Sequence, residues 1–265
     1  MDPLPQQVAA AARIRLPVYD ADAIEVPFVA LGWSETIGAD TWWDEHAHPT
    51  HELLWNQRGA SSATAGARHW TLTPAQGLWV PAGVRHSGWA PAGTQQRAVH
   101  FSVRRARPLA AGPVAVQVTP LLRLLLDRLE EDDLAEVSRA TTEAMVLDVL
   151  CPAPRELCLP LPGSALLAPV VAALRADPAD PRTLAEWATQ LQVSARTVTR
   201  AFQAETGLGF GRWVAAARVQ HAIALLAQGE GIEEIAGRTG FGSVSAFGAA
   251  FRRVTGTSPG RFRAQ

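Results

Sequence analysis

The sequence predicts an α+β protein of two domains, with a β-barrel at the front and an all-helical domain at the end. Between about Val26 and Val103, short apolar segments alternate with Gly, Pro, Ser and Thr turns, which is typical of a small barrel or sandwich. From Gly231 to Arg263 the chain reads as a helix, a glycine-containing turn and a second helix. An earlier stretch repeats that plan. A length of 265 residues suits two domains.

The helical end contains an internal repeat. Trp187-Ala188 corresponds to Ile235-Ala236, Val198 and Phe202 to Phe247 and Phe251, and Thr206-Gly207 to Thr255-Gly256. Apolar residues four positions apart share one helix face, so each aromatic ring should pack against the preceding helix. We therefore expect two helix-turn-helix units, at about 183–206 and 232–255. A lead helix (166–175) should precede them, and one long helix (211–228) should join them.

A helix-turn-helix unit places its second helix in the major groove of DNA. In the first unit Ser194 is expected to cap that helix. The outward residues of both units are the candidate DNA contacts: Ser194, Arg196, Thr197, Thr199, Arg200 and Gln203, then Ser243, Val244, Ser245 and Arg252. Arg196 is the best candidate base reader, since a guanidinium matches guanine O6 and N7. The small residues of the second unit predict that the first unit carries more of the specificity.

Charge is divided between the two ends of the chain. The formal net charge is −1, yet residues 181–265 hold ten arginines and five glutamates. The residues before them hold 14 arginines and 20 acidic groups. A basic end and an acidic front fit a DNA-binding domain attached to a domain that avoids DNA.

The segment between the two ends should contain two helices. Thr119 can cap the first, with Pro120 at its first position. Leu121, Leu122, Leu125 and Leu129 form one stripe, and Leu124 and Leu126 widen it. So broad a stripe predicts packing on both the barrel and a second subunit, and the alternative is a helix packed only on its own barrel. Residues 151–164, with four prolines, are expected to form an extended linker.

The helical end closely resembles the AraC/XylS family of bacterial transcription regulators. Its anchors are Ile235, Gly240, Phe241, Phe247, Phe251, Gly256, Ser258 and Pro259. Ala246 and Phe262 depart from it, because tyrosine is common at both positions. The resemblance covers roughly the last hundred residues. It implies sequence-specific binding of promoter DNA, a homodimer, RNA polymerase as a candidate partner and a cytoplasmic location.

A second resemblance lies in the barrel. The spacing HxHx3E, then x6-G, then PxGxxH resembles the two motifs of cupins, which are RmlC-like barrels. In metal-binding cupins the matching residues are the ligands, here His46, His48, Glu52 and His86. Three imidazoles and a carboxylate suit Zn, Fe, Mn or Ni. One departure is Ala90, where asparagine often ends the second motif. The alternative is a metal-free barrel that binds a small organic molecule, as in many AraC-type sensor domains. His51 and His100 are weaker candidates.

Seven of the nine tryptophans precede residue 100. Most should belong to the barrel core, and Trp33, Trp55 and Trp79 are the candidates for lining an effector pocket.

These features predict a regulator in three parts: a cupin-like sensor (1–105), a helical dimerisation region with a linker (106–163) and the DNA-binding domain (164–265). The effector would be a small organic molecule or a metal ion. The competing reading is a metal-dependent cupin enzyme, such as a dioxygenase or isomerase, with DNA binding attached.

Cys151 and Cys158 are too few for a zinc site of their own and indicate a reduced chain, with a redox switch as the alternative. The sequence shows neither a signal peptide nor a membrane span.

Overall fold

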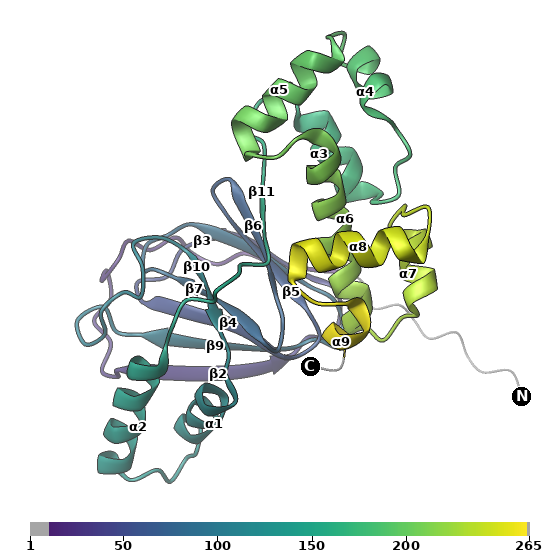
Figure 1. Ribbon diagram of the computed structural model, residues 1–265. Coiled ribbons are helices and arrows are strands. Elements are labelled where there is room, and N and C mark those ends of the chain that lie inside the picture. Colours follow the sequence, from purple (N-terminus) through teal and green to yellow (C-terminus); the bar gives the residue numbers. More distant parts are fainter. Residues whose placement is uncertain (1–10, 264–265) are drawn as a thin grey trace, which may run out of the picture. The chain divides into compact units, whose positions relative to one another are not determined.

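The computed structural model describes residues 11–263 (Figure 1). Its described residues form two compact units, one of residues 11–63 and 72–153 and the other of residues 64–71 and 154–263. The strands are β1 (Ala12–Ile14), β2 (Ala30–Thr36), β3 (Thr41–His46), β4 (His51–Arg58), β5 (Ser61–Ala65), β6 (Arg68–Leu72), β7 (Gln76–Val80), β8 (His86–Ala90), β9 (Gln95–Phe101), β10 (Val114–Gln117) and β11 (Cys158–Pro160). The helices are α1 (Pro120–Leu129), α2 (Glu136–Val149), α3 (Ala168–Ala176), α4 (Leu184–Gln190), α5 (Ala195–Thr206), α6 (Phe210–Ala227), α7 (Ile232–Arg238), α8 (Val244–Thr255) and α9 (Pro259–Arg263).

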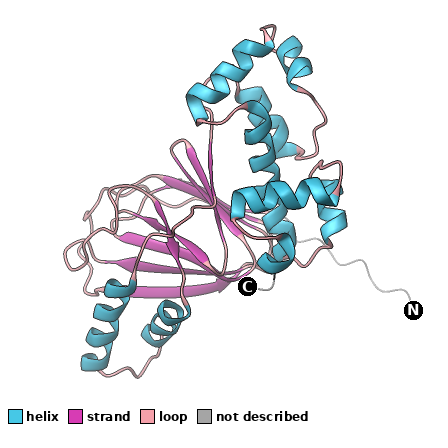
Figure 2. Ribbon diagram, viewed as in Figure 1, coloured by secondary structure: helices cyan, strands magenta, loops and turns pink. Residues whose placement is uncertain are grey.

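The strands form two sheets, drawn in magenta in Figure 2. One has the order β1-β3-β8-β5-β6-β11 and the other the order β10-β7-β4-β9-β2. Side chains alternate between the two faces of a strand. In β4, Glu52 and Leu54 therefore face a cavity, whereas Leu53 and Trp55 face the opposite way and join the main apolar cluster.

Helices α1 and α2 cover the outward face of the five-stranded sheet. Thr119 accepts a hydrogen bond from the backbone N–H of Leu122, and Pro120 stands at the first turn, as expected. The buried stripe of α1 is Leu122, Leu125, Leu126 and Leu129, packed with Trp55, Trp79 and Phe101. Leu121, which the sequence placed in that stripe, is instead 48% exposed because it lies on the far side of the helix.

Two expected boundaries shift in the structure. β10 pairs with β7, so the sheet continues beyond residue 105, where we expected the barrel to end. The predicted linker is extended at Cys158–Pro160, but this part is not a free connection, because it forms β11 and pairs with β6. Strand pairing joins residues far apart in sequence, so neither feature leaves a local sequence signal.

The helical unit contains the predicted repeat, and α6 joins its two halves (Figure 1). Ser194 and Ser243 cap α5 and α8 by accepting hydrogen bonds from the backbone N–H three residues on. Gly207 and Gly256 end the same helices in the left-handed conformation, which glycine adopts without steric cost. The paired residues Val198 and Phe202, and Phe247 and Phe251, are fully buried.

Arg218 of α6 ties to that helix both the loop before the first helix-turn-helix unit and the turn within the second. Its guanidinium donates hydrogen bonds to the carbonyls of Pro178 (2.9 Å) and Asp180 (2.9 Å) before α4, and to that of Gly240 (2.7 Å) between α7 and α8. Gly240 has a φ of +73°, and a Cβ there would lie 2.9 Å from the Arg218 guanidinium. The turn at Gly240 therefore requires glycine for both conformation and space.

None of the helices between residues 11 and 263 combines the length and apolar character needed to cross a membrane.

Candidate functional site

The four predicted metal ligands come together at one end of the barrel. His46 ends β3 and pairs with His86 at the start of β8, in the six-stranded sheet. Glu52 lies in β4 opposite His100 of β9, in the five-stranded sheet. His48 lies in the connection between β3 and β4. The two sheets thus contribute facing groups to one cluster.

Distances place one carboxylate among the imidazoles. Glu52 Oε2 is 3.2 Å from His86 Nε2 and 3.6 Å from His48 Nε2. The ligand atoms of His46, His48 and His86 lie within 4.8 Å of one another. His46, Glu52 and His86 are each at most 4% exposed, so water contributes little to solvating this cluster.

Backbone carbonyls set the tautomers of two of the histidines. His46 Nδ1 donates to the Asp44 carbonyl (2.7 Å) and His86 Nδ1 donates to the Val84 carbonyl (3.1 Å). Since a carbonyl only accepts, the proton of each neutral ring lies on Nδ1, and Nε2 keeps its lone pair. His51 has the reverse tautomer, because its Nδ1 accepts from the Ala82 backbone N–H (3.0 Å).

The cluster also shifts the acidity of its members. Burial lowers the pKa of His48 to about 4, despite the opposing effect of Glu52. Burial raises the pKa of Glu52, but the hydrogen-bonding and charge effects of His86, His48 and His100 outweigh it and bring that pKa to about 2. Near neutral pH the cluster therefore offers a carboxylate and at least one neutral imidazole, the protonation states that metal ligation requires.

The residues fit a transition metal. Glu52 Oε2 and His86 Nε2 are buried and, among the described residues, neither makes a well-aligned hydrogen bond. The two atoms face each other at 3.2 Å with poor hydrogen-bond alignment, and a bound cation would give both a better partner. The carbonyl contacts at Nδ1 are the outer interactions usual for histidine ligands.

His100 adds a fourth imidazole beside the predicted set. Its Nε2 lies 3.9 Å from Glu52 Oε1, and its Nδ1 is 2.9 Å from the Thr50 hydroxyl. The sequence ranked His100 and His51 together. The structure separates them, because β9 directs His100 into the cavity while His51 packs against Trp79 on the other side of β4.

A cavity of about 260 Å³ opens next to this cluster. Of the predicted pocket tryptophans only Trp33 lines it. Trp55 and Trp79 lie instead in the cluster beneath α1 and are fully buried there, because their strand positions face away from the cavity. Trp43 of β3 takes the role expected of them, and Gln96 of β9 is a further polar lining residue. No local sequence pattern marks either residue as a lining residue, because only the strand pairing places them there.

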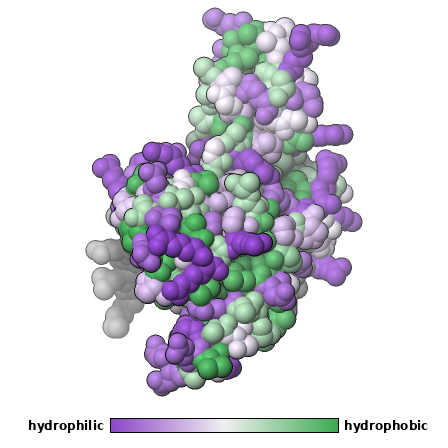
Figure 3. Space-filling view, turned by 90° about the vertical axis from the view of Figure 1, so that its left-hand side faces the viewer, coloured by the Kyte–Doolittle hydropathy of each residue, from purple (hydrophilic) through white to green (hydrophobic). Residues whose placement is uncertain are grey.

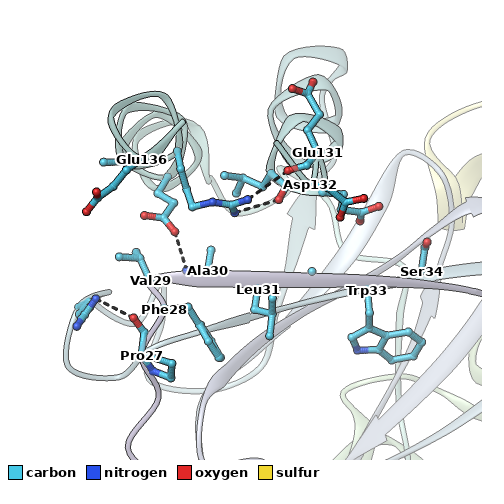
Figure 4. Close-up of a pocket in the computed structure, with 17 residues that line it drawn as sticks. Pro27, Phe28, Val29, Ala30, Leu31, Trp33, Ser34, Glu131, Asp132 and Glu136 are labelled. Atoms are coloured by element: carbon cyan, nitrogen blue, oxygen red, sulfur yellow. Dashed lines mark hydrogen bonds between the residues drawn. The ribbon is translucent and has the colours of Figure 1, made fainter. Parts of the chain in front are cut away.

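A second hollow, about 790 Å³, lies between β2 and the connection from α1 to α2 (Figure 4). Its arginines are engaged with backbone: Arg139 donates to the Leu129 and Glu131 carbonyls and Arg105 to the Pro27 carbonyl. Glu143 accepts from the Ala30 backbone N–H at 3.4 Å. These contacts tie the helical hairpin to the edge of the sheet.

All ten predicted DNA contacts are exposed on the helical unit: Ser194, Arg196, Thr197, Thr199, Arg200, Gln203, Ser243, Val244, Ser245 and Arg252. Several of them also make hydrogen bonds within their own helix. Ser194 and Ser243 are caps, and Gln203 donates to the Gly207 carbonyl at 2.9 Å. Arg196 and Arg200 have no ion-pair partner among residues 11–263, so both remain available to an incoming anion.

Sequence comparisons agree with both units. Residues 34–147 match the AraC-like ligand binding domain and residues 187–265 match a helix-turn-helix domain. The chain is an AraC-family transcriptional regulator. Its family match assigns ligand binding to the β-rich part and DNA binding to the helical part.

Individual relatives are regulators as well. The chain is 25% identical over 224 residues to the HTH-type transcriptional regulator NimR of Escherichia coli, covering 83% of this chain and 82% of that one. It is 42% identical over 103 residues to the regulator RipA of Corynebacterium glutamicum, which is 39% of this chain and only 31% of RipA. The solved structure of ToxT from Vibrio cholerae is similar over 89% of this chain and 97% of its own, at 11% identity and a TM-score of 0.38.

Proposed function

We propose that the ligand-binding barrel of this AraC-family regulator holds one divalent transition metal through His46, His48, Glu52 and His86. The observation that carries the proposal is the buried Glu52 carboxylate, which the Nε2 atoms of His86 and His48 approach to 3.2 and 3.6 Å. Zn, Fe, Mn and Ni all suit this donor set. When bound, the ion would supply an electron-pair acceptor within the cavity.

Metal content tests this proposal. The untagged chain, purified without chelator, should carry about one metal ion by mass spectrometry. Glu52→Gln and His86→Ala should lose it, because each removes one donor. His69→Gln alters a histidine outside the cluster and should keep the metal. A chain that carries no metal and takes none up on titration would contradict the proposal, and the cluster would then be a polar lining for an organic effector.

We further propose that the chain acts as a homodimer through α1 and α2. Leu121 (48% exposed), Leu124 (67%), Val137 (81%) and Met145 (43%) present apolar surface there. Hydrophobic residues are visible among hydrophilic ones at this end of the molecule (Figure 3). Exposed large apolar side chains on two packed helices favour association. Leu124→Glu should produce monomers in sedimentation experiments, whereas Ile24→Glu, which changes an exposed apolar residue elsewhere, should leave the dimer intact.

Strand β9 offers a physical link between the cavity and this hairpin. Its residues Gln96 and His100 face the cavity. Arg97 between them faces α1, where it pairs with Asp127 (2.6 Å) and Glu130. A change in the cavity that moves β9 would therefore reach α1 directly. We propose that effector binding shifts the dimer along this route and so changes promoter occupancy.

The barrel is proposed to sense its ligand without turning it over, in line with the names of its relatives. The competing reading is a metal-dependent cupin enzyme. Product formation by the metal-loaded chain from a bound ligand would support that reading, and recovery of the ligand unchanged would support a sensor.

A further inference from the structure

The cavity beside the metal-ligand cluster is polar on one side and mainly apolar on the other. One side is formed by the imidazoles and Glu52, and the rest mainly by Trp33, Trp43, Leu54 and Leu72. Its volume of about 260 Å³ lies just below the usual range for drug-sized ligands. The space therefore suits a small molecule of about ten non-hydrogen atoms, and the two indole rings favour a planar one.

Gln96 is one of the polar residues lining this cavity that the metal cluster does not use, along with Ser62 and Ser87. It is 8% exposed, and its Oε1 atom lacks a hydrogen-bond partner among the described residues. A buried acceptor without a partner costs stability, and a ligand that donates to it recovers that cost. Its place in β9, on the same face as His100, sets the Gln96 side chain in the cavity wall.

The donor set leaves room for a ligand on the ion. Three imidazoles and one carboxylate occupy four positions, whereas Fe, Mn and Ni commonly take six. Two positions would then remain for atoms of a bound molecule. The ion and Glu52 together carry a net positive charge, which favours a ligand that binds through an anionic oxygen.

We propose that this cavity binds a small planar chelator, which gives two donor atoms to the metal and an N–H or O–H group to Gln96 Oε1. The inference rests on the proposed metal site. Gln96 is the residue that distinguishes ligands, since a molecule without the donor leaves a buried acceptor unpaired.

Two matched probes test the role of Gln96. Benzohydroxamate chelates through two oxygens and carries one N–H, and N-methylbenzohydroxamate chelates in the same way without it. Each is titrated into the Co²⁺-loaded full-length chain, and the visible absorption bands of the ion report binding. Benzohydroxamate should bind at least about tenfold more tightly, as expected for a hydrogen bond to a buried acceptor.

Two variants complete the experiment. Gln96→Leu should take up Co²⁺ as the wild type does, yet bind both probes with equal affinity. Gln57→Leu changes an exposed glutamine of β4 that does not line the cavity, and it should preserve the tenfold preference.

The outcomes separate the inference from the metal site. Co²⁺ uptake with equal affinity for the two probes, or a preference that persists in Gln96→Leu, would overturn the inference and leave the metal site standing. Co²⁺ uptake with no binding of either probe would also overturn the inference and leave the metal site standing. Failure to take up Co²⁺ would overturn both.

Discussion

Glu52 is the residue on which the barrel site depends. It is buried at 4% exposure, lies within 3.6 Å of two imidazole nitrogens, and its pKa is lowered to about 2. A carboxylate kept ionised in so buried a place needs positive charge nearby. With an ion bound, the metal supplies that charge, and without one the histidines must carry it.

This leads to a pH-dependent prediction for His86. Burial lowers its pKa, but the contact with Glu52 more than offsets that and raises it above the ordinary value. The metal-free chain therefore retains a proton on His86 to higher pH than a free imidazole would, and metal binding must displace it. Calorimetric titration in buffers of different ionisation enthalpy should show more protons released per metal at about pH 6 than at about pH 8. Equal release at both pH values would contradict this assignment.

Arg196 permits a prediction at the DNA surface. It is exposed on α5 and unpaired among the described residues, so Arg196→Ala should preserve the fold. If the guanidinium reads a guanine, the variant should lose about 1–3 kcal/mol on the cognate site and less on random DNA. Binding to both DNAs can be measured by fluorescence anisotropy at a fixed salt concentration. An equal loss on both would identify a phosphate contact instead.

Strand β9 and helix α6 each hold several parts of their unit together. For β9 the residue to change is Arg97, which is 4% exposed and pairs with two carboxylates of the α1 segment. Arg97→Met keeps most of the side-chain volume but removes the charge. We expect metal content to stay unchanged while DNA affinity loses its dependence on the metal. Retained dependence would show that the signal does not pass through this contact.

For α6 the residue is Arg218. Arg218→Met removes three hydrogen bonds to carbonyls, two in the loop before α4 and one in the turn between α7 and α8. The free energy of local opening should fall by roughly 2–4 kcal/mol. Hydrogen exchange of the α7 and α8 amides would measure this change, with the exposed Arg212→Met as control. Unchanged protection would mean that helix packing alone fixes these turns.

Features with a local sequence signal were predictable. Ser194 and Ser243 as caps, Gly207 and Gly256 as helix ends, and the buried pairs Val198 and Phe202, and Phe247 and Phe251, all follow from spacing within one helix. His46, His48, Glu52 and His86 come together as the resemblance implied.

Features that depend on strand pairing were not predictable. Trp43 and Gln96 line the cavity only because β3 and β9 present those positions inward, and Trp55 and Trp79 leave it because α1 covers the opposite face. The exposure of Leu121 likewise depends on which side of α1 meets the sheet.

At the scale of the whole molecule, the chain joins a ligand-binding domain to a DNA-binding domain. We propose that the first domain controls the second. The most direct test is the affinity of the full-length chain for a DNA site selected from a random pool. It should be measured with the metal bound and after removal of the metal by chelator, at one salt concentration.

We predict at least about a tenfold difference between the two states, the coupling expected of two linked sites, and no difference for His48→Ala in a folded chain. Equal affinity in both states, with the metal verified by mass spectrometry, would contradict the claim that the metal state of the barrel governs DNA binding.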